Sequence, residues 1–399
     1  MNNFIFISPH FPDNFWRFCL ALKNRGFNVL GIGDCPYDNL QDGLKYALTE
    51  YYCCYNMENF ENEARAVKYF QDKYGHIDYL ESQNEYWLER DAKLREMFQI
   101  STGVYSEEVK FYKHKSLQKE KFINAGCKVA RFTLDNTKEG ILKFVKEVGY
   151  PIFAKPDNGV GAHGTFKIDS ESDIDNFISK KDSSEVYILE EYVYGQIISY
   201  DGISNSKGDV IFSTSNEFVP SVADIVNMNL DDMYYTVPEI NKEFDEIGRR
   251  VVKSFNLRNR FFHIEFFRLL EDHPYLGKKG TIIPLEGNMR PAGGYTPDII
   301  NFANSISCYD IYADSIAYDE NRQISIGGKF YAISSSRRYN INYEHSSEEI
   351  INKYSNYICA QGEFAKILRD AMGDYYFIAK FKDLNEALSF DEFVRKKKK

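Results

Sequence analysis

The stretch 284–294 constrains this chain most strongly, because three polar residues in it stand at every second position. An apolar run leads into the stretch, and a Pro-Ala-Gly-Gly sequence ends it. Successive side chains of a β-strand point to opposite faces, so Glu286, Asn288 and Arg290 would share one face. Glu and Asn are poor strand residues and need a reason to be there. The sequence predicts a strand over residues 282–290 with a functional face.

The oxygen-bearing residues of this face suit a hard divalent cation. Mg²⁺ binds oxygen ligands and usually keeps phosphates and waters in its coordination shell. A strand whose polar side chains simply face water would alternate in the same way, and this alternative stays open on the pattern alone. We favour a metal site, because an Asn such as Asn288 is hard to explain by folding requirements of a strand.

Composition limits the class of protein. The chain has 399 residues, enough for two or three domains, and its 43% hydrophobic and 27% charged residues are ordinary for a globular protein. A net charge of −10 argues against a nucleic-acid surface as the main partner. The seven cysteines form no C-x-x-C pair, and no apolar run reaches the length of a membrane span. We therefore expect a cytoplasmic protein with reduced thiols and no membrane partner.

The first part of the chain alternates short apolar runs with helical patterns. Residues 4–8 and 27–33 read as strands, and residues 14–24 between them have helical spacing. This βαβ order predicts a small parallel sheet. Residues 85–126 then read as helices, with an interruption near residues 101–103.

A glycine-rich loop at residues 159–164 matches the pattern G-x-G-x-x-G. A dinucleotide-binding loop of that pattern must open a helix, but the β-type segment 165–168 follows here. The loop therefore joins two strands, and its backbone N–H groups could cover phosphates. Lys155 lies in the apolar strand before it and needs an anion there. For His163 at the loop tip, a phosphate contact and an ordinary exposed position are both open.

Four features follow one another along the chain: Lys155 before the glycine-rich loop, the loop itself, a Glu-Glu pair that ends an apolar strand (Glu190 and Glu191), and Glu265 with the later Glu-x-Asn-x-Arg stretch. In this order they resemble the ATP-grasp superfamily of carboxylate–amine (or thiol) ligases. The resemblance covers about residues 105–310 and rests on the order of the motifs more than on any one of them. It implies an α/β and α+β chain with four parts. These are an N-terminal βαβ (pre-ATP-grasp) domain over 1–110, a small subdomain with the glycine flap over 111–188, a large subdomain with the metal site over 189–320, and a mixed C-terminal region over 321–399.

The resemblance also assigns roles to single residues. It implies that ATP is bound by Lys115 (with Lys113 as the competing choice), Lys155, the flap residues Gly161, Ala162 and His163, and the hinge residues Glu190, Glu191, Tyr192 and Val193. It implies that Mg²⁺, with Mn²⁺ as an alternative, is held by Glu265, Glu286 and Asn288. Arg290 matches the catalytic arginine that stabilises the transferring phosphoryl group and the acyl phosphate.

One position departs from the family pattern. The family usually has a glutamate for the ribose hydroxyls two positions after the hinge glycine, but here Gly195 is followed at that distance by Ile197. An isoleucine side chain cannot accept a hydrogen bond from a hydroxyl. Gln196 and Asp201 are the candidates to replace the missing carboxylate.

The implied reaction is an ATP-dependent ligation of two small molecules. A carboxylate would be activated as an acyl phosphate and coupled to an amine, for example an amino acid. Candidates for holding the substrate are His263, which shares a strand face with Glu265, and more weakly Arg268 and Arg337. Biotin-carboxylase-like or other acceptor chemistry, and a non-catalytic ATP-binding module, are the alternatives. A homodimer is left open.

Overall fold

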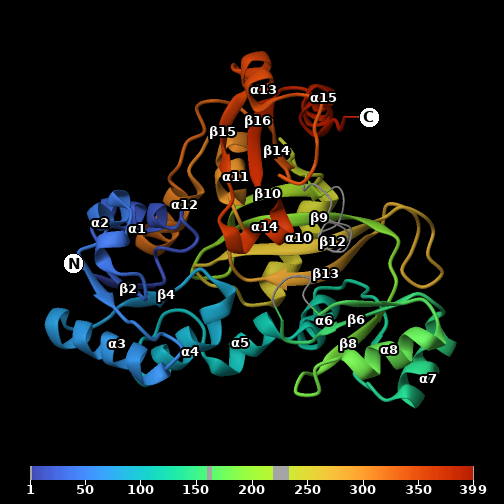
Figure 1. Ribbon diagram of the computed structural model, residues 1–399. Coiled ribbons are helices and arrows are strands. Elements are labelled where there is room, and N and C mark those ends of the chain that lie inside the picture. The colour runs from blue at the N-terminus through green and yellow to red at the C-terminus, as the bar shows by residue number, and fades with distance from the viewer. Residues whose placement is uncertain (1, 160–163, 219–232, 399) are drawn as a thin grey trace.

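The computed structural model describes residues 2–159, 164–218 and 233–398, and it contains three β-sheets flanked by helices (Figure 1). The N-terminal sheet is parallel, with strand order β3-β2-β1-β4. Its elements are β1 (Asn3–Ile7), α1 (Trp16–Asn24), β2 (Asn28–Gly33), α2 (Asp42–Ala47), β3 (Glu50–Cys53), α3 (Phe60–Tyr74), β4 (Tyr79–Glu81) and α4 (Leu88–Met97). The predicted βαβ order of this region is confirmed.

Helix α3 illustrates how local sequence sets these elements. The side chain of Asn59 caps its first turn by accepting a hydrogen bond from the backbone N–H of Glu61. Gly75 follows its last turn with a φ of 84°, a conformation that favours glycine. Val67 and Phe70 belong to its buried face, which packs on the sheet. The capping residue, the glycine after the last turn and the apolar face of α3 are thus all consistent with the same helix.

Two helices connect the N-terminal sheet to the rest of the chain. They are α5 (Ser106–Lys113) and α6 (Lys115–Asn124), and His114 between them has an extended backbone. The helices expected over residues 85–126 are therefore interrupted at His114 as well, and Lys113 belongs to the helix before this break. Asp157 caps the start of α6, because one of its carboxylate oxygens accepts a 2.7 Å hydrogen bond from the backbone N–H of Ser116.

A second, smaller sheet has the strand order β5-β8-β6-β7 and is antiparallel. Its elements are β5 (Phe132–Thr133), α7 (Lys138–Val148), β6 (Ile152–Pro156), β7 (Phe166–Ile168), α8 (Glu171–Lys180) and β8 (Tyr187–Glu191). The glycine-rich loop joins the antiparallel neighbours β6 and β7, as its sequence context predicted. Three residues assigned to this loop, Gly161, Ala162 and His163, lie outside the described residues.

The largest sheet has eight strands in the order β13-β12-β9-β10-β11-β14-β16-β15. Its strands are β9 (Gly195–Ser204), β10 (Val210–Phe218), β11 (Met233–Thr236), β12 (Phe261–Leu269), β13 (Ile282–Asn288), β14 (Tyr331–Arg337), β15 (Ile358–Glu363) and β16 (Tyr375–Phe381). Its helices are α10 (Lys242–Ser254), α11 (Thr296–Asn304), α12 (Cys308–Tyr318), α13 (Ser347–Tyr354), α14 (Arg369–Met372) and α15 (Leu384–Arg395). The strands after residue 320 therefore continue the sheet begun by β9 to β13.

Strand β13 is shorter and less regular than the sequence predicted. It ends at Asn288, so Arg290 lies in the turn that follows. Opposite it on β12, Glu265 pairs with Glu286 and Phe266 pairs with Pro284, so Leu285 is an extra residue in the register. A proline donates no hydrogen bond, and β13 is an edge strand where this is tolerated.

The N-terminal sheet packs against the large domain through an aromatic core. The ring of Phe18 from α1 lies 4.7 Å from that of Tyr309 and 5.3 Å from that of Tyr312, both on α12. All three side chains are buried in one hydrophobic cluster. The segment after β4 also lies close to the turn after β13, because Glu85 in that segment forms an ion pair with Arg290 in that turn.

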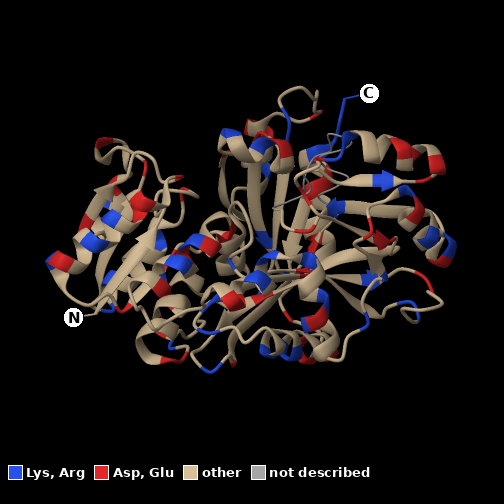
Figure 2. Ribbon diagram, turned by 90° about the horizontal axis from the view of Figure 1, so that it is seen from below, with Lys and Arg blue, Asp and Glu red and all other residues tan. Residues whose placement is uncertain are grey.

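Two further features concern the surface. Among the described helices, none combines the length and the apolar character that a membrane span requires. Basic and acidic residues are interspersed over the molecule, and several also lie on the central strands (Figure 2). Charged residues on central strands need a partner or a ligand, and they are the starting point for the search for a functional site.

Candidate active site

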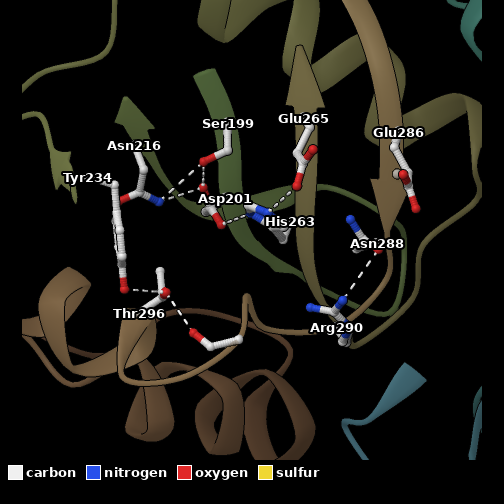
Figure 3. Close-up of polar contacts among 12 residues, drawn as sticks. Ser199, Asp201, Asn216, Tyr234, His263, Glu265, Glu286, Asn288, Arg290 and Thr296 are labelled. Atoms are coloured by element: carbon white, nitrogen blue, oxygen red, sulfur yellow. Dashed lines mark hydrogen bonds and ion pairs between the residues drawn. The ribbon is translucent and has the colours of Figure 1, made fainter. Parts of the chain in front are cut away.

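The predicted metal ligands come together at the edge of the large sheet (Figure 3). Glu265 on β12 lies directly opposite Glu286 on β13, and His263 lies opposite Asn288. Directly opposed residues of an antiparallel pair point to the same face. The side chains of Glu265 and Glu286 are 23% and 18% exposed, so both carboxylates reach solvent. Two carboxylates and one amide thus share one accessible face.

These ligands fit a magnesium ion better than a zinc ion in a closed structural site. Within residues 2–159, 164–218 and 233–398, no group of three or more His, Cys, Asp or Glu side chains is arranged to hold a metal ion. Structural zinc sites need such a group. Mg²⁺ is instead held by one or two carboxylates together with substrate phosphates and waters. Glu265, Glu286 and Asn288 supply oxygen atoms of the required kind.

His263 lies between two carboxylates. Its Nδ1 is 2.7 Å from Oδ1 of Asp201, and its Nε2 is 3.2 Å from Oε1 of Glu265. Burial alone would lower the pKa of His263, but the charge of Asp201 and the two hydrogen bonds raise it to about 10. Burial would raise the pKa of Glu265, but the hydrogen bond and charge of His263 lower it. The imidazolium therefore donates to both carboxylates at neutral pH.

Asp201 is fully committed to this network. It is completely buried, and its Oδ2 accepts hydrogen bonds from Ser199 and from Nδ2 of Asn216. Gln196, the other suggested substitute for a ribose-binding glutamate, donates a 3.1 Å hydrogen bond to Glu217. The expectation that Asp201 could bind the ribose is therefore wrong, because its oxygens already hold three buried neighbours.

The two predicted phosphate lysines point toward carboxylates of the site. Nζ of Lys115 lies 3.4 Å from Oε1 of Glu286 and donates a 2.9 Å hydrogen bond to the carbonyl oxygen of Gly159. Nζ of Lys155 lies 2.5 Å from Oε2 of Glu190. Burial would lower the pKa of Lys155, but Glu190 and the metal-site carboxylates raise it. Lys155 thus remains cationic beside the predicted metal site.

A third lysine was missed by the sequence reasoning. Lys119 lies one helical turn after Lys115 on α6 and forms an ion pair with Oε1 of Glu190. Its side chain is only 2% exposed. Residues four apart share one face of a helix, so the spacing from Lys115 was a signal that could have identified it.

Arg290 has a partner from the N-terminal domain, and this partner was also missed. Its Nε and Nη2 donate hydrogen bonds of 3.0 and 2.8 Å to the same carboxylate oxygen of Glu85. Nη2 also lies 3.5 Å from Oδ1 of Asn288. Glu85 follows β4 and is buried, so the N-terminal domain contributes directly to this part of the site.

The hinge residues divide into two groups. Glu190 faces the lysines, whereas the next residue, Glu191, points to the opposite face and pairs with Arg131 at 2.5 Å. Val193 is buried in an apolar cluster. Tyr192 is 40% exposed and lines a pocket of about 460 Å³ together with Tyr194, Leu269, Glu271 and His273. An open, partly aromatic pocket therefore lies beside the hinge.

Two of the substrate candidates lie elsewhere. Arg268 stands three positions after Glu265, hence on the opposite face of β12, where its Nη2 lies 2.9 Å from Oε1 of Glu217. Arg337 on β14 donates hydrogen bonds to the carbonyl oxygens of Val394 and His345. The structure brings His263 to the metal ligands and brings neither arginine there.

Solved structures share the fold of this protein over nearly the whole chain. An L-amino acid ligase from Bacillus licheniformis superposes with a TM-score of 0.72 and 14% identity, covering 98% of this chain and 96% of the other. N5-carboxyaminoimidazole ribonucleotide synthetase from Thermotoga maritima gives a TM-score of 0.66 and 17% identity, with 98% and 96% covered. The chain has the ATP-grasp fold.

Sequence comparison with curated proteins reaches only part of the chain. It is 32% identical over 88 residues to D-alanine–D-alanine ligase B of Clostridium perfringens, covering 21% of this chain and 29% of the ligase. It is 30% identical over 95 residues to the arginine-specific carbamoyl phosphate synthase large chain of Bacillus subtilis, covering 24% of this chain and 9% of that protein. The chain thus spans less than a third of either relative, and no family model matches it.

Proposed function

We propose that the chain is an ATP-dependent ligase that activates a small-molecule carboxylate as an acyl phosphate and couples it to an amine. The observation that carries this proposal is the convergence of two lysines, two carboxylates and one arginine on one accessible region. Lys115 contacts Glu286, Lys155 is held by Glu190, and Arg290 lies beside Asn288. Phosphoryl transfer needs positioning and charge neutralisation more than covalent help from the protein, and these groups supply both.

Each group has a distinct part in the proposed reaction. Lys115 and Lys155 hold the phosphates of ATP, and Glu265, Glu286 and Asn288 hold Mg²⁺, which neutralises phosphate charge when it is bound. His263 donates a hydrogen bond to one oxygen of Glu265 and so fixes the orientation of that carboxylate. Arg290 stabilises negative charge on the transferring phosphoryl group, because its planar guanidinium matches phosphate oxygens.

The position of Glu85 favours an amino acid as the activated substrate. A carboxylate that reaches Arg290 also comes close to the carboxylate of Glu85, which would repel a simple anion. A substrate that carries an ammonium group beside its carboxylate would be attracted to both residues. The similar fold from Bacillus licheniformis is that of an L-amino acid ligase, which agrees with this substrate class.

A phosphate-release screen tests the proposal. The protein would be incubated with ATP and Mg²⁺, and with single and paired amino acids, simple carboxylates and amines. We expect ADP and phosphate release in stoichiometric amounts only when an amino acid is present, and an acyl hydroxamate when hydroxylamine replaces the amine. ATP consumption without a trappable acyl group would contradict the acyl phosphate.

The screen also separates the alternative functions. Activity with bicarbonate instead of amino acids would point to biotin-carboxylase-like chemistry. Tight ATP binding with no ADP production across the whole panel would support a non-catalytic ATP-binding module, the alternative that the Ile197 departure favours.

A further inference from the structure

Glu190 lies between two buried lysines that come from different elements. Lys119 from α6 pairs with its Oε1, and Lys155 from β6 lies 2.5 Å from its Oε2. All three side chains are largely shielded from water, with exposed fractions of 2% for Lys119, 14% for Lys155 and 7% for Glu190. One buried anion is therefore shared by two cations.

The two lysines differ in what else they can reach. Lys119 is the more deeply buried, and its only other hydrogen-bond acceptor among the described residues is the carbonyl oxygen of Leu285 at 3.5 Å. Lys155 is more exposed, and the carboxylates of Glu286 and Glu265 act on it electrostatically. Lys155 can thus turn toward a ligand at the metal site, whereas Lys119 is confined to Glu190.

We propose that Lys119 is a positioning residue that serves as the permanent counter-ion of Glu190 and so frees Lys155 to bind the nucleotide phosphates. This inference rests on the proposed function, because it requires a nucleotide at this site. If Lys119 were absent, Glu190 would hold Lys155 as its sole cation. A buried charge without a partner is costly, so phosphates would have to compete with Glu190 for Lys155.

A double-mutant cycle tests this role through the dissociation constant of Mg-ADP, measured by calorimetry. We expect Lys119→Met to weaken binding about tenfold or more. Glu190→Gln removes the anion that competes for Lys155, so Lys119→Met should change the dissociation constant much less in the Glu190→Gln background than in the wild type. Lys121→Met, on the same helix with its ammonium over the ring of Phe111, is the matched control and should bind as the wild type does.

The outcomes separate the possible failures. If Lys119→Met loses the same factor in the presence and absence of Glu190→Gln, Lys119 acts by general attraction and the proposed role is overturned. If Lys119→Met binds as the wild type does, the role is overturned as well. If the wild type itself binds no nucleotide, the proposed function fails and this inference fails with it. Lys119→Arg keeps the charge and provides a folded variant with wild-type affinity if Lys119→Met does not fold.

Discussion

Two clusters of buried charge in this protein each set two cations against one carboxylate, but they differ in the type of cation and in how far they reach solvent. In the first, Arg260 donates hydrogen bonds to Glu81 and to the carbonyl oxygen of Met289. Arg95 lies 3.3 Å from the same Glu81 and donates hydrogen bonds to two backbone carbonyls. The two arginines are 0–1% exposed. These contacts tie the N-terminal domain to the turn that carries Arg290.

The second cluster contains Lys119, Lys155 and Glu190 and extends to Lys115 and Glu286. Its cations are lysines, each a single flexible charge, and several of its side chains reach solvent. The difference teaches that burial of charge does not by itself indicate function. An arginine cluster that is almost completely buried and hydrogen-bonded to backbone carbonyls stabilises a domain contact, whereas a more accessible lysine cluster can exchange a partner for a ligand.

The largest effect is expected at the metal ligand Glu286. Glu286→Ala removes a carboxylate that the accessible cluster needs, so ADP release with Mg²⁺ should fall below detection. The free energy of unfolding should change little, because the side chain is partly exposed. Steady-state ADP release and urea unfolding measure the two effects. Glu246→Ala, an exposed residue on α10, is the control. Near-normal turnover by folded Glu286→Ala would refute the metal assignment.

The next effect concerns the arginine cluster. Arg260→Met leaves Glu81 with less compensation in the interior and should lower the free energy of unfolding by about 3–5 kcal/mol. Lys155→Met should cost much less stability and should instead abolish nucleotide binding. Urea unfolding and calorimetric titration with Mg-ADP measure both quantities. Equal destabilisation by the two substitutions would remove the distinction between the clusters.

The buried Glu63 differs from both clusters, because it has no close hydrogen-bond partner among the described residues. Glu63 on α3 is completely buried, neither of its oxygens has a hydrogen-bond partner among the described residues, and Arg90 lies 3.5 Å away. Burial raises the pKa of Glu63 to about 8. The folded state therefore binds this proton more tightly than the unfolded chain, and stability falls as the pH rises from about 4.5 to 8.

Glu63→Gln should remove this penalty. We expect the variant to be more stable than the wild type by about 1–3 kcal/mol at pH 8.5, the cost of a buried group without partners, with a smaller difference at pH 4.5. Unfolding at several pH values measures the difference, and the exposed Glu61→Gln on the same helix is the control. A difference that does not change with pH would contradict the assignment.

The smallest effect is expected at Ile197. This residue pairs with Phe267 and lies on the face of the sheet that carries Glu265. Ile197→Glu would supply an acceptor for ribose hydroxyls, and the new hydrogen bond should be worth about 1.5 kcal/mol. The KM for ATP should fall by roughly tenfold and that for 2′-deoxy-ATP by less, because the latter lacks one hydroxyl. An equal change for both nucleotides would show that the residue does not reach the ribose.

Much of the fold followed from local patterns. The alternation of apolar runs and helical spacing predicted the parallel N-terminal sheet, and the β-type segment after the glycine-rich loop predicted a loop between strands. The break between α5 and α6 was missed because no local pattern marks the extended conformation of His114. The end of β13 and its irregular register at Leu285 were missed because they depend on pairing with β12.

The sequence by itself determined which residues share a strand face, since that follows from a period of two. It placed Glu286 and Asn288 on one face of their strand and His263 and Glu265 on one face of theirs. The same rule places Arg268 on the opposite face of its strand. Tertiary structure alone decided the pairing of Arg290 with Glu85, of Lys119 with Glu190, and of Arg260 with Glu81. These partners are far apart in the chain, and the ion pairs form only after the sheets and α12 have packed together.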